Sequence, residues 1–300
     1  MGSHGQARLF GVLGDPVDHS LSPAMQNAAF AAAGLPHIYL RYRVPAARLA
    51  GAVREAKALR MGGLNLTVPL KEAVLPLLDA VSPEAGRIGA VNTVVFEADG
   101  RTLGENTDGQ GFLRALRGRA RLRGARAVVI GAGGSARAVG TALGLAGCAS
   151  ITIANRTATR GERLAERLSK LGVAATAVPI VAVSRGDILE DATMVINTTP
   201  LGLAGAGLAV RYAATRPGCL FIDLVYGARP TPFLLGATRA RRPTLDGGEM
   251  LLHQGALAFE AWTGRRAPRS AMARALRAAG LSLTEPEAAG TVAAHRPPTR

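Results

Sequence analysis

The fold class is decided by residues 127–136, which read AVVIGAGGSA. The apolar residues at its start predict a short buried strand, and the glycine-rich turn that follows fits the pattern G-x-G-x-x-A. Gly131 permits a tight turn, and Gly133 lets a pyrophosphate approach the backbone. A helix that begins at this turn directs its N–H groups toward the phosphates. The stretch therefore predicts a dinucleotide site made of Gly131, Ala132, Gly133, Gly134, Ser135 and Ala136.

Strands and helices alternate after this turn, as expected for a doubly wound parallel sheet. The expected strands are 127–130, 150–155, 194–197 and 220–225, with a further segment near 174–178, and the expected helices are 135–145 and 159–171. The second strand ends in Asn155, Arg156 and Thr157, with Arg160 close behind. An NAD site usually has an acidic residue here for the ribose hydroxyl, whereas an amide, a hydroxyl and two guanidinium groups suit a 2′-phosphate. We therefore predict NADP as the cofactor.

The residues before 108 also alternate between strands and helices, which predicts a second α/β unit with a mostly parallel sheet. Expected strands are 9–13, 39–44 and 62–68, followed by a hairpin over 91–97 and 101–104; expected helices are 22–33, 46–59, 70–78 and 109–119, with a short helix beginning at 82–83. A chain of 300 residues is too long for one ordinary core and suits two domains. Residues 250–263 predict a further helix.

Composition narrows the class of partner. The formal charge of +15 invites a nucleic-acid interpretation, but the arginines are scattered and no aromatic residues interleave with them. We therefore expect no nucleic-acid partner. No stretch is long and apolar enough for a membrane span, and no secretory signal begins the chain, so we expect a cytoplasmic protein. The two cysteines and five histidines show no ligand spacing, which predicts no disulfide and no metal site.

Residues 65–71 read NLTVPLK and place a lysine just beyond a strand-to-helix corner. Asn65 and Thr67 are two residues apart, so on a strand they face the same side, while Leu66 and Val68 would face a core. Lys71 is one of only three lysines, against 33 arginines. The pKa of a lysine can be tuned by its surroundings, which makes Lys71 a candidate proton donor, although a solvated lysine at a helix start remains the alternative.

Other polar residues stand near expected helix starts or in apolar segments. Ser22 followed by Pro23 is a good helix start, which leaves Ser20 free to bind a ligand. Asp108 could cap the helix that follows it, or it could take part in chemistry. Asn92 lies just before an expected strand, and Gln254 lies in an apolar helical stretch where a polar side chain needs a partner.

These residues together resemble the shikimate dehydrogenase family over roughly residues 8–280. The matching stretches are 14–16, 19–23, 65–71, 89–93, 106–109, 131–136, 155–157, 223–226, 246–248, 250–251 and 254–256. The resemblance implies an N-terminal α/β substrate domain, a Rossmann-type NADP domain and C-terminal helices that return to the first domain. It places the substrate domain at residues 6–107 plus 247–280 and the NADP domain at 108–246.

The resemblance also implies roles for single residues. Lys71 and Asp108 would form the catalytic pair of a reversible, NADPH-dependent reduction of 3-dehydroshikimate to shikimate at C3. Ser20 and Ser22 would hold the substrate carboxylate, with Tyr226 nearby. The residues that would bind the ring hydroxyls are Asn65, Thr67, Asn92 and Gln254. The expected partner is thus a small molecule, and the chain is expected to be a monomer or a homodimer.

Three positions depart from the family pattern: Gln26 replaces a usual histidine, Pro200 a frequent serine and Ala228 a frequent proline. The last two are expected near the nicotinamide end of the cofactor. The alternative substrates are quinate and aminoshikimate, although a serine at position 22 favours shikimate over quinate. A non-catalytic cofactor-binding regulator is a third reading, against which the intact Lys71 and Asp108 argue. Residues 203–209 predict a mobile loop, and residues 281–300 a disordered tail.

Overall fold

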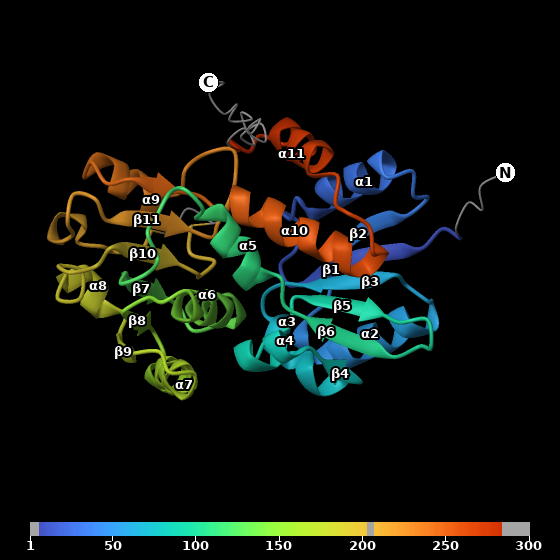
Figure 1. Cartoon of the computed structure of the whole chain (residues 1–300), viewed down its shortest axis with the longest axis horizontal. Helices are drawn as coiled ribbons and strands as arrows, with labels where there is room; N and C mark the ends of the chain where they lie inside the picture. Colours follow the sequence, from blue (N-terminus) through green and yellow to red (C-terminus); the bar gives the residue numbers. More distant parts are fainter. Residues whose placement is uncertain (1–5, 203–206, 284–300) are drawn as a thin grey trace, which may run out of the picture.

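The computed structural model describes residues 6–202 and 207–283, which form two six-stranded sheets lying next to each other (Figure 1). The first sheet has the order β2-β1-β3-β5-β6-β4. Its strands are β1 (Leu9–Gly14), β2 (Ile38–Arg43), β3 (Gly63–Leu66), β4 (Ala80–Val81), β5 (Thr93–Phe96) and β6 (Thr102–Glu105). Strands β1, β2 and β3 pair in parallel, as do β4 and β6, whereas β5 is antiparallel to both β3 and β6. The mostly parallel sheet and the β5–β6 hairpin are as predicted.

The helices of this half are α1 (Ser22–Ala32), α2 (Leu49–Ala58), α3 (Leu70–Ala73) and α4 (Pro83–Ile88), with 3₁₀ turns at Ala46–Arg48 and Leu75–Leu77. The predicted helix over residues 70–78 is wrong in its second half. Pro76 has no backbone N–H to donate to the preceding turn, so the α-helix ends at Ala73 and a 3₁₀ turn follows.

The second sheet is wholly parallel and has the order β9-β8-β7-β10-β11-β12. In chain order this is 3-2-1-4-5-6, the arrangement of the Rossmann fold. Its strands are β7 (Arg126–Ile130), β8 (Ser150–Asn155), β9 (Ala175–Pro179), β10 (Met194–Asn197), β11 (Leu220–Asp223) and β12 (Thr244–Leu245). The predicted doubly wound sheet is therefore confirmed.

The helices around this sheet are α5 (Asp108–Ala115), α6 (Gly134–Leu145), α7 (Ala158–Lys170), α8 (Val181–Arg185) and α9 (Pro232–Arg239), with a 3₁₀ turn at Tyr212–Ala214. Helix α5 is shorter than predicted and ends before Gly118, whose φ is +76°. Helix α9 was not predicted, although Thr231 followed by Pro232 is a helix-start signal. In the structure the Thr231 hydroxyl accepts a hydrogen bond from the N–H of Leu234, which caps the helix.

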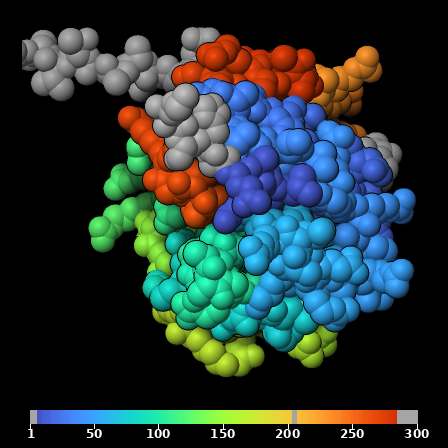
Figure 2. Space-filling model, turned by 90° about the vertical axis from the view of Figure 1, so that its right-hand side faces the viewer, coloured from blue at the N-terminus to red at the C-terminus, as the bar shows by residue number. Residues whose placement is uncertain are grey.

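The last two helices, α10 (Gly248–Thr263) and α11 (Arg269–Ala278), return to the first sheet. Phe259 of α10 and Met272 of α11 share one buried core with Phe10 and Phe30. The indole N–H of Trp262 donates to the carbonyl of Val94 at 3.0 Å. In Figure 1, α10 runs between the two halves beside α5, and Figure 2 shows α11 in red-orange lying over the blue N-terminal segments. The implied return of the C-terminal helices is therefore observed.

Most of the predicted mobile loop and tail, residues 203–206 and 284–300, lies outside the described residues. Residues 207–209 and 281–283 have no regular secondary structure, yet Leu281 is buried against the α11 core. None of the helices in the described part of the chain has the length and apolar character needed to cross a membrane.

Candidate active site

The lysine corner is built where β3 ends. The strand stops at Leu66. Asn65 and Thr67 both line one cavity, as predicted, and Leu66 joins the core while also bordering that cavity. Val68 was expected in the core but is 46% exposed, because the alternation of faces ends with the strand. Pro69 is the N-cap of α3, which places Lys71 in its first turn.

Asn65 is held rigidly by its neighbours. Its amide nitrogen donates to the Asn92 carbonyl and to the Thr93 hydroxyl, both at 3.0 Å, and its oxygen accepts from the Tyr39 hydroxyl at 2.7 Å. Tyr39 is fully buried, and this burial raises the pKa of its phenol well above the usual value. The phenol is thus a neutral, permanent hydrogen-bond donor that orients Asn65.

Lys71 and Asp108 form an ion pair at the centre of the site. The Lys71 ammonium lies 2.5 Å from Asp108 Oδ2 and also donates to the Ser135 hydroxyl at 3.0 Å. Asn92 donates to the other Asp108 oxygen at 2.8 Å. The lysine and aspartate side chains are only 12% and 5% exposed. Because the pair is buried, water screens the attraction between its charges only weakly. The strong attraction holds the ammonium group in one position.

Capping does not explain Asp108. It is the first residue of α5, behind the N-cap residue Thr107, and its own N–H donates to the Asn106 side chain at 3.0 Å. The Asn106 side chain therefore accepts the backbone hydrogen bond at this helix start. The Asp108 carboxylate is free to face Lys71. The solvated-lysine alternative for Lys71 is excluded by the same contacts.

Two serines and a tyrosine form another part of the cavity wall. Ser22 is not the N-cap of α1, because the helix begins at Ser22 and Leu21 occupies the cap position. The Ser20 hydroxyl instead accepts a hydrogen bond from the Ser22 N–H at 3.3 Å. Burial raises the pKa of Tyr226, while contacts with Ser20 and the Leu21 backbone oppose the shift. These three hydroxyl groups offer uncharged donors to an anionic ligand group.

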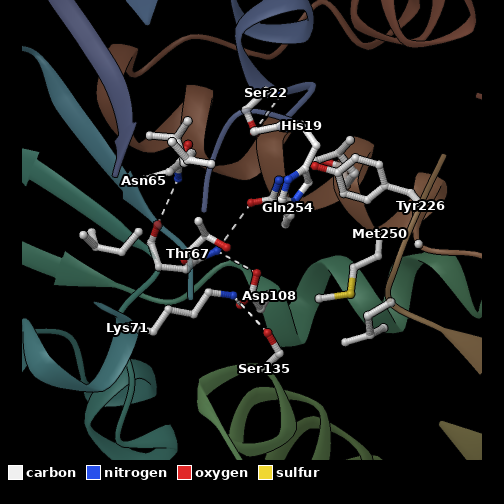
Figure 3. A pocket seen from close by; sticks show the side chains of 18 of the residues that line it. His19, Ser22, Asn65, Thr67, Lys71, Asp108, Ser135, Tyr226, Met250 and Gln254 are labelled. Atoms are coloured by element: carbon white, nitrogen blue, oxygen red, sulfur yellow. Dashed lines mark hydrogen bonds and ion pairs between the residues drawn. The ribbon is translucent and has the colours of Figure 1, made fainter. Parts of the chain in front are cut away.

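All nine residues predicted for catalysis and substrate binding line the same cavity of about 160 Å³ (Figure 3). These residues lie far apart along the sequence, and the fold brings them together from β3, α1, α5 and α10. Gln254 is anchored by its amide donating to the Leu251 carbonyl at 2.9 Å, and its oxygen lies 3.4 Å from the Asn92 amide nitrogen. The nine residues are Ser20, Ser22, Asn65, Thr67, Lys71, Asn92, Asp108, Tyr226 and Gln254.

The dinucleotide turn lies against this cavity. Gly131 has a φ of +111°, and a Cβ there would come within 2.6 Å of the Thr198 hydroxyl oxygen, so only glycine fits. Helix α6 begins at Gly134 directly after the turn, as predicted, and Ala136 is buried. A Cβ on Gly134 would lie 2.8 Å from Lys71 Cβ, and Ser135 lines the cavity itself. The glycine-rich turn and the candidate proton donor are therefore neighbours.

The end of β8 carries the residues predicted for the 2′-phosphate. Asn155 Nδ2 donates to the Thr157 carbonyl at 2.8 Å, Thr157 is the N-cap of α7 with its hydroxyl not used for capping, and Arg156 is exposed. Arg160 Nη2 lies 3.2 Å from Glu72 Oε1, which belongs to α3 of the first half. Strand β8 and its turn contribute no carboxylate here, so the donor set fits a phosphate better than a ribose hydroxyl.

No group of three His, Cys, Asp or Glu side chains in residues 6–202 and 207–283 is arranged to hold a metal ion. Cys148 and Cys219 are both free and buried.

Comparison with known proteins agrees with this geometry. Family sequence models match residues 12–94 (shikimate dehydrogenase substrate binding domain), 114–200 (shikimate/quinate 5-dehydrogenase) and 247–277 (shikimate 5′-dehydrogenase C-terminal domain). The NADP(+) shikimate dehydrogenase of Moorella thermoacetica is 48% identical over 286 residues, which cover 93% of this chain and 96% of that protein. The chain belongs to the shikimate dehydrogenase family.

Solved structures of the family show the same architecture. The Thermus thermophilus shikimate 5-dehydrogenase in complex with shikimate has a TM-score of 0.78 at 42% identity, covering 91% of this chain and 98% of that one. The Corynebacterium glutamicum quinate dehydrogenase in complex with NAD has a TM-score of 0.80 at 34% identity, covering 91% and 100%. The family therefore includes both shikimate and quinate enzymes of this fold.

The three departures from the family pattern lie in different surroundings. Gln26 is fully buried and donates to the Gly255 carbonyl at 2.9 Å, outside the cavity lining. Pro200 follows Thr198 and Thr199, which lie beside Gly131 of the dinucleotide turn. Ala228 lines a separate hollow of about 260 Å³ and lies near Gly280. A position of Pro200 and Ala228 at the nicotinamide end stays a prediction.

Sequence reasoning missed several residues of the site. Tyr39 was assigned only to a strand, since nothing local shows that its hydroxyl reaches Asn65. The apolar walls of the cavity are formed by Met250, Leu251 and Leu224. In the sequence these residues cannot be distinguished from ordinary core residues. His19 was quoted in a motif without a role and also lines the cavity.

Proposed function

We propose that this chain is an NADP-dependent shikimate dehydrogenase, which reversibly reduces 3-dehydroshikimate to shikimate in the pathway to chorismate and the aromatic amino acids. The observation that carries the proposal is the position of Lys71, bonded at once to Asp108 in the substrate cavity and to Ser135 of the dinucleotide turn. A reaction between a bound substrate and a nicotinamide must take place where these two regions meet, and Lys71 is the proton-carrying group at that point.

The coenzyme site is assigned to the second domain. The residues that would hold the pyrophosphate are Gly131, Ala132, Gly133, Gly134, Ser135 and Ala136, and those that would hold the 2′-phosphate are Asn155, Arg156, Thr157 and Arg160. When bound, NADPH supplies the hydride, so the protein itself has only to place the substrate and to handle one proton.

Lys71 is the proposed general acid. Its ammonium donates a proton to the C3 carbonyl oxygen of 3-dehydroshikimate as that oxygen becomes an alcohol, and the neutral amine takes the proton back during oxidation. Asp108 keeps Lys71 Nζ in place, and Asn92 in turn fixes the orientation of the Asp108 carboxylate. Asp108 also offers an acceptor to a ring hydroxyl.

The rest of the cavity recognises the substrate. Ser20, Ser22 and Tyr226 are proposed to bind the carboxylate through three uncharged hydroxyls. The residues proposed for the ring hydroxyls are Asn65, Thr67, Asn92 and Gln254. A cavity of neutral donors and acceptors with one Lys and one Asp suits a polyhydroxylated acid, because each ligand oxygen can be paired.

The domain limits follow the two sheets: residues 6–107 plus 247–280 are proposed as the substrate domain and 108–246 as the NADP domain. A monomer or homodimer in the cytoplasm remains our prediction for the state and location of the chain.

Quinate is the second candidate substrate, favoured by the likeness to the quinate dehydrogenase of C. glutamicum. Aminoshikimate is a further alternative. Reduction of NADP⁺ and of NAD⁺ by the purified protein, with shikimate or quinate as substrate, separates these cases. Fast turnover with shikimate and NADP⁺ alone is expected. A preference for quinate or NAD⁺ would contradict the proposed substrate or coenzyme specificity but not the proposed role of Lys71 as general acid. Absence of turnover with every pair would reject the proposed function.

A further inference from the structure

Two successive residues of α3 bind the NADP domain, and only the first has a place in the proposed reaction. Lys71 reaches Ser135, and Glu72 reaches two arginines. Glu72 Oε2 accepts from Arg137 Nη2 of α6 at 2.7 Å, and Glu72 Oε1 accepts from Arg160 Nη2 of α7 at 3.2 Å. One carboxylate of the substrate domain thus bridges two cations of the coenzyme domain.

The two halves of this bridge differ in strength. The Arg137 side chain is 18% exposed, and its Nε is buried with no partner among the described residues. Burial lowers the pKa of Arg137, as do the nearby charges of Arg167 and Arg160, while Glu72 opposes the shift. The Glu72–Arg137 bond is therefore a fixed anchor, because breaking it would leave a partly buried cation uncompensated.

The bond to Arg160 is the weaker half. Arg160 is 54% exposed and its bond is longer, so water screens the interaction. A guanidinium carries five N–H donors in one plane and pairs well with phosphate. The bond to Glu72 occupies one of the Arg160 donors that would otherwise be available to the coenzyme phosphate. The negative charge of the Glu72 carboxylate also repels the negative charge of a phosphate bound next to it.

We infer that Glu72 competes with the 2′-phosphate of NADP for Arg160 and thereby sets the affinity for the phosphorylated coenzyme. The inference rests on the proposed function, since it takes Arg160 as a 2′-phosphate ligand. Binding of the phosphate replaces the Glu72–Arg160 bond, while the Arg137 bond and the Lys71–Ser135 contact still join α3 to the coenzyme domain. Glu72 is thus a positioning residue that links coenzyme recognition to the helix that carries Lys71.

The test uses two coenzyme fragments that differ only in the 2′-phosphate, 2′,5′-ADP and 5′-AMP, titrated into the full-length protein by calorimetry. Removal of one carboxylate from a half-exposed pair corresponds to a change of about 2- to 5-fold. Glu72→Gln is therefore expected to bind 2′,5′-ADP about 2- to 5-fold more tightly and 5′-AMP unchanged. The glutamine keeps an amide oxygen as a hydrogen-bond acceptor for Arg137 but no longer compensates its charge, so urea unfolding of the variant checks that the fold is intact.

The matched control is Glu55→Gln on α2, an exposed glutamate whose loss changes the net charge equally. It is expected to leave the affinity for both fragments unchanged. If Glu55→Gln tightens 2′,5′-ADP as much as Glu72→Gln does, the effect is one of overall charge and the inference fails. Weaker binding of 2′,5′-ADP by Glu72→Gln would show that the carboxylate supports Arg160 rather than competes for it, which also overturns the inference.

Arg160→Gln completes a double-mutant cycle and is safe for folding because Arg160 is largely exposed. Alone it should weaken the binding of 2′,5′-ADP severalfold. In its presence the effect of Glu72→Gln should fall to the small remainder that comes from direct repulsion between the carboxylate and the phosphate. An undiminished Glu72→Gln effect would refute the competition while leaving the coenzyme assignment intact. An Arg160→Gln variant with normal affinity would refute the assignment of Arg160 and the inference together, whereas shikimate turnover by the unaltered protein judges the proposed reaction separately.

Discussion

Replacement of Lys71 by alanine is expected to lower kcat about 10²- to 10⁴-fold, the usual cost of losing a positioned general acid. At 1.36 kcal/mol for each factor of ten, this corresponds to about 3–5 kcal/mol of transition-state stabilisation. The substrate KM should change much less, because we propose that other residues bind the carboxylate and hydroxyl groups of the substrate.

The same substitution should also affect stability, for a reason that the structure makes explicit. Asp108 is only 5% exposed, and without the Lys71 ammonium its carboxylate keeps Asn92 as its one side-chain partner among the described residues. A buried acceptor that loses its partner costs about 1–3 kcal/mol, and more when it is charged. Adding Asp108→Asn to the Lys71→Ala variant should restore much of the stability and none of the activity.

The assay is the steady-state reduction of NADP⁺ with shikimate, followed by the absorbance of NADPH, with urea unfolding of each variant in parallel. Lys57→Ala is the matched control, since Lys57 pairs with Asp79 at the surface, with the two side chains 46% and 44% exposed. It should change kcat little and stability by about 1 kcal/mol at most. A Lys71→Ala enzyme that keeps more than about a tenth of the normal turnover would remove Lys71 from the chemistry.

Three further substitutions test other parts of the reasoning. Arg156→Asp should shift the coenzyme preference from NADP⁺ toward NAD⁺, and an unchanged ratio of kcat/KM values for the two coenzymes would contradict the 2′-phosphate assignment. Ser22→Thr should raise activity with quinate relative to shikimate, measured as the ratio of kcat/KM. Asp223 is fully buried, and burial raises its pKa from 3.8 to about 6, against hydrogen bonds from Thr231 and Asn197. Because the folded chain then binds more protons than the unfolded chain between these values, stability contributed by Asp223 is lost as the pH rises through this window. Relative to Asp223→Asn, the wild type should lose on the order of 3 kcal/mol of unfolding free energy from about pH 4 to about pH 7, and parallel pH profiles of the two proteins would refute this.

Much of the fold could be predicted because its signals are local. The turn at Gly131 needs a backbone conformation that glycine adopts most easily, and an apolar strand before it and a helix after it follow from short-range pattern alone. Signals over only a few residues were less informative, since β4 and β12 have two residues each and show no periodicity. The end of α3 was misjudged although the cause, Pro76, was visible in the sequence.

The residues of the site could be predicted, largely through the family resemblance. Their arrangement in space could not. Capping was a sound alternative for Ser22 and for Asp108, because a helix start near a polar residue is satisfied locally in most proteins. The structure excludes it in both cases, since each helix begins at the polar residue itself, the residue before it is the N-cap, and the polar side chain lines the cavity.

The two α/β halves and the glycine-rich turn follow from the sequence alone, because strand alternation and glycine conformations are properties of neighbouring residues. The sequence also names the polar residues that line the cavity. Three contacts depend on how the chain packs: Tyr39 orients Asn65, Lys71 touches Ser135, and Glu72 joins the two domains through Arg137 and Arg160. These contacts join residues that lie far apart along the chain. They exist because the pairing of β1 with both β2 and β3 places Tyr39 near Asn65, and because α3 of the first half lies against α6 and α7 of the second. No local pattern encodes such a distance.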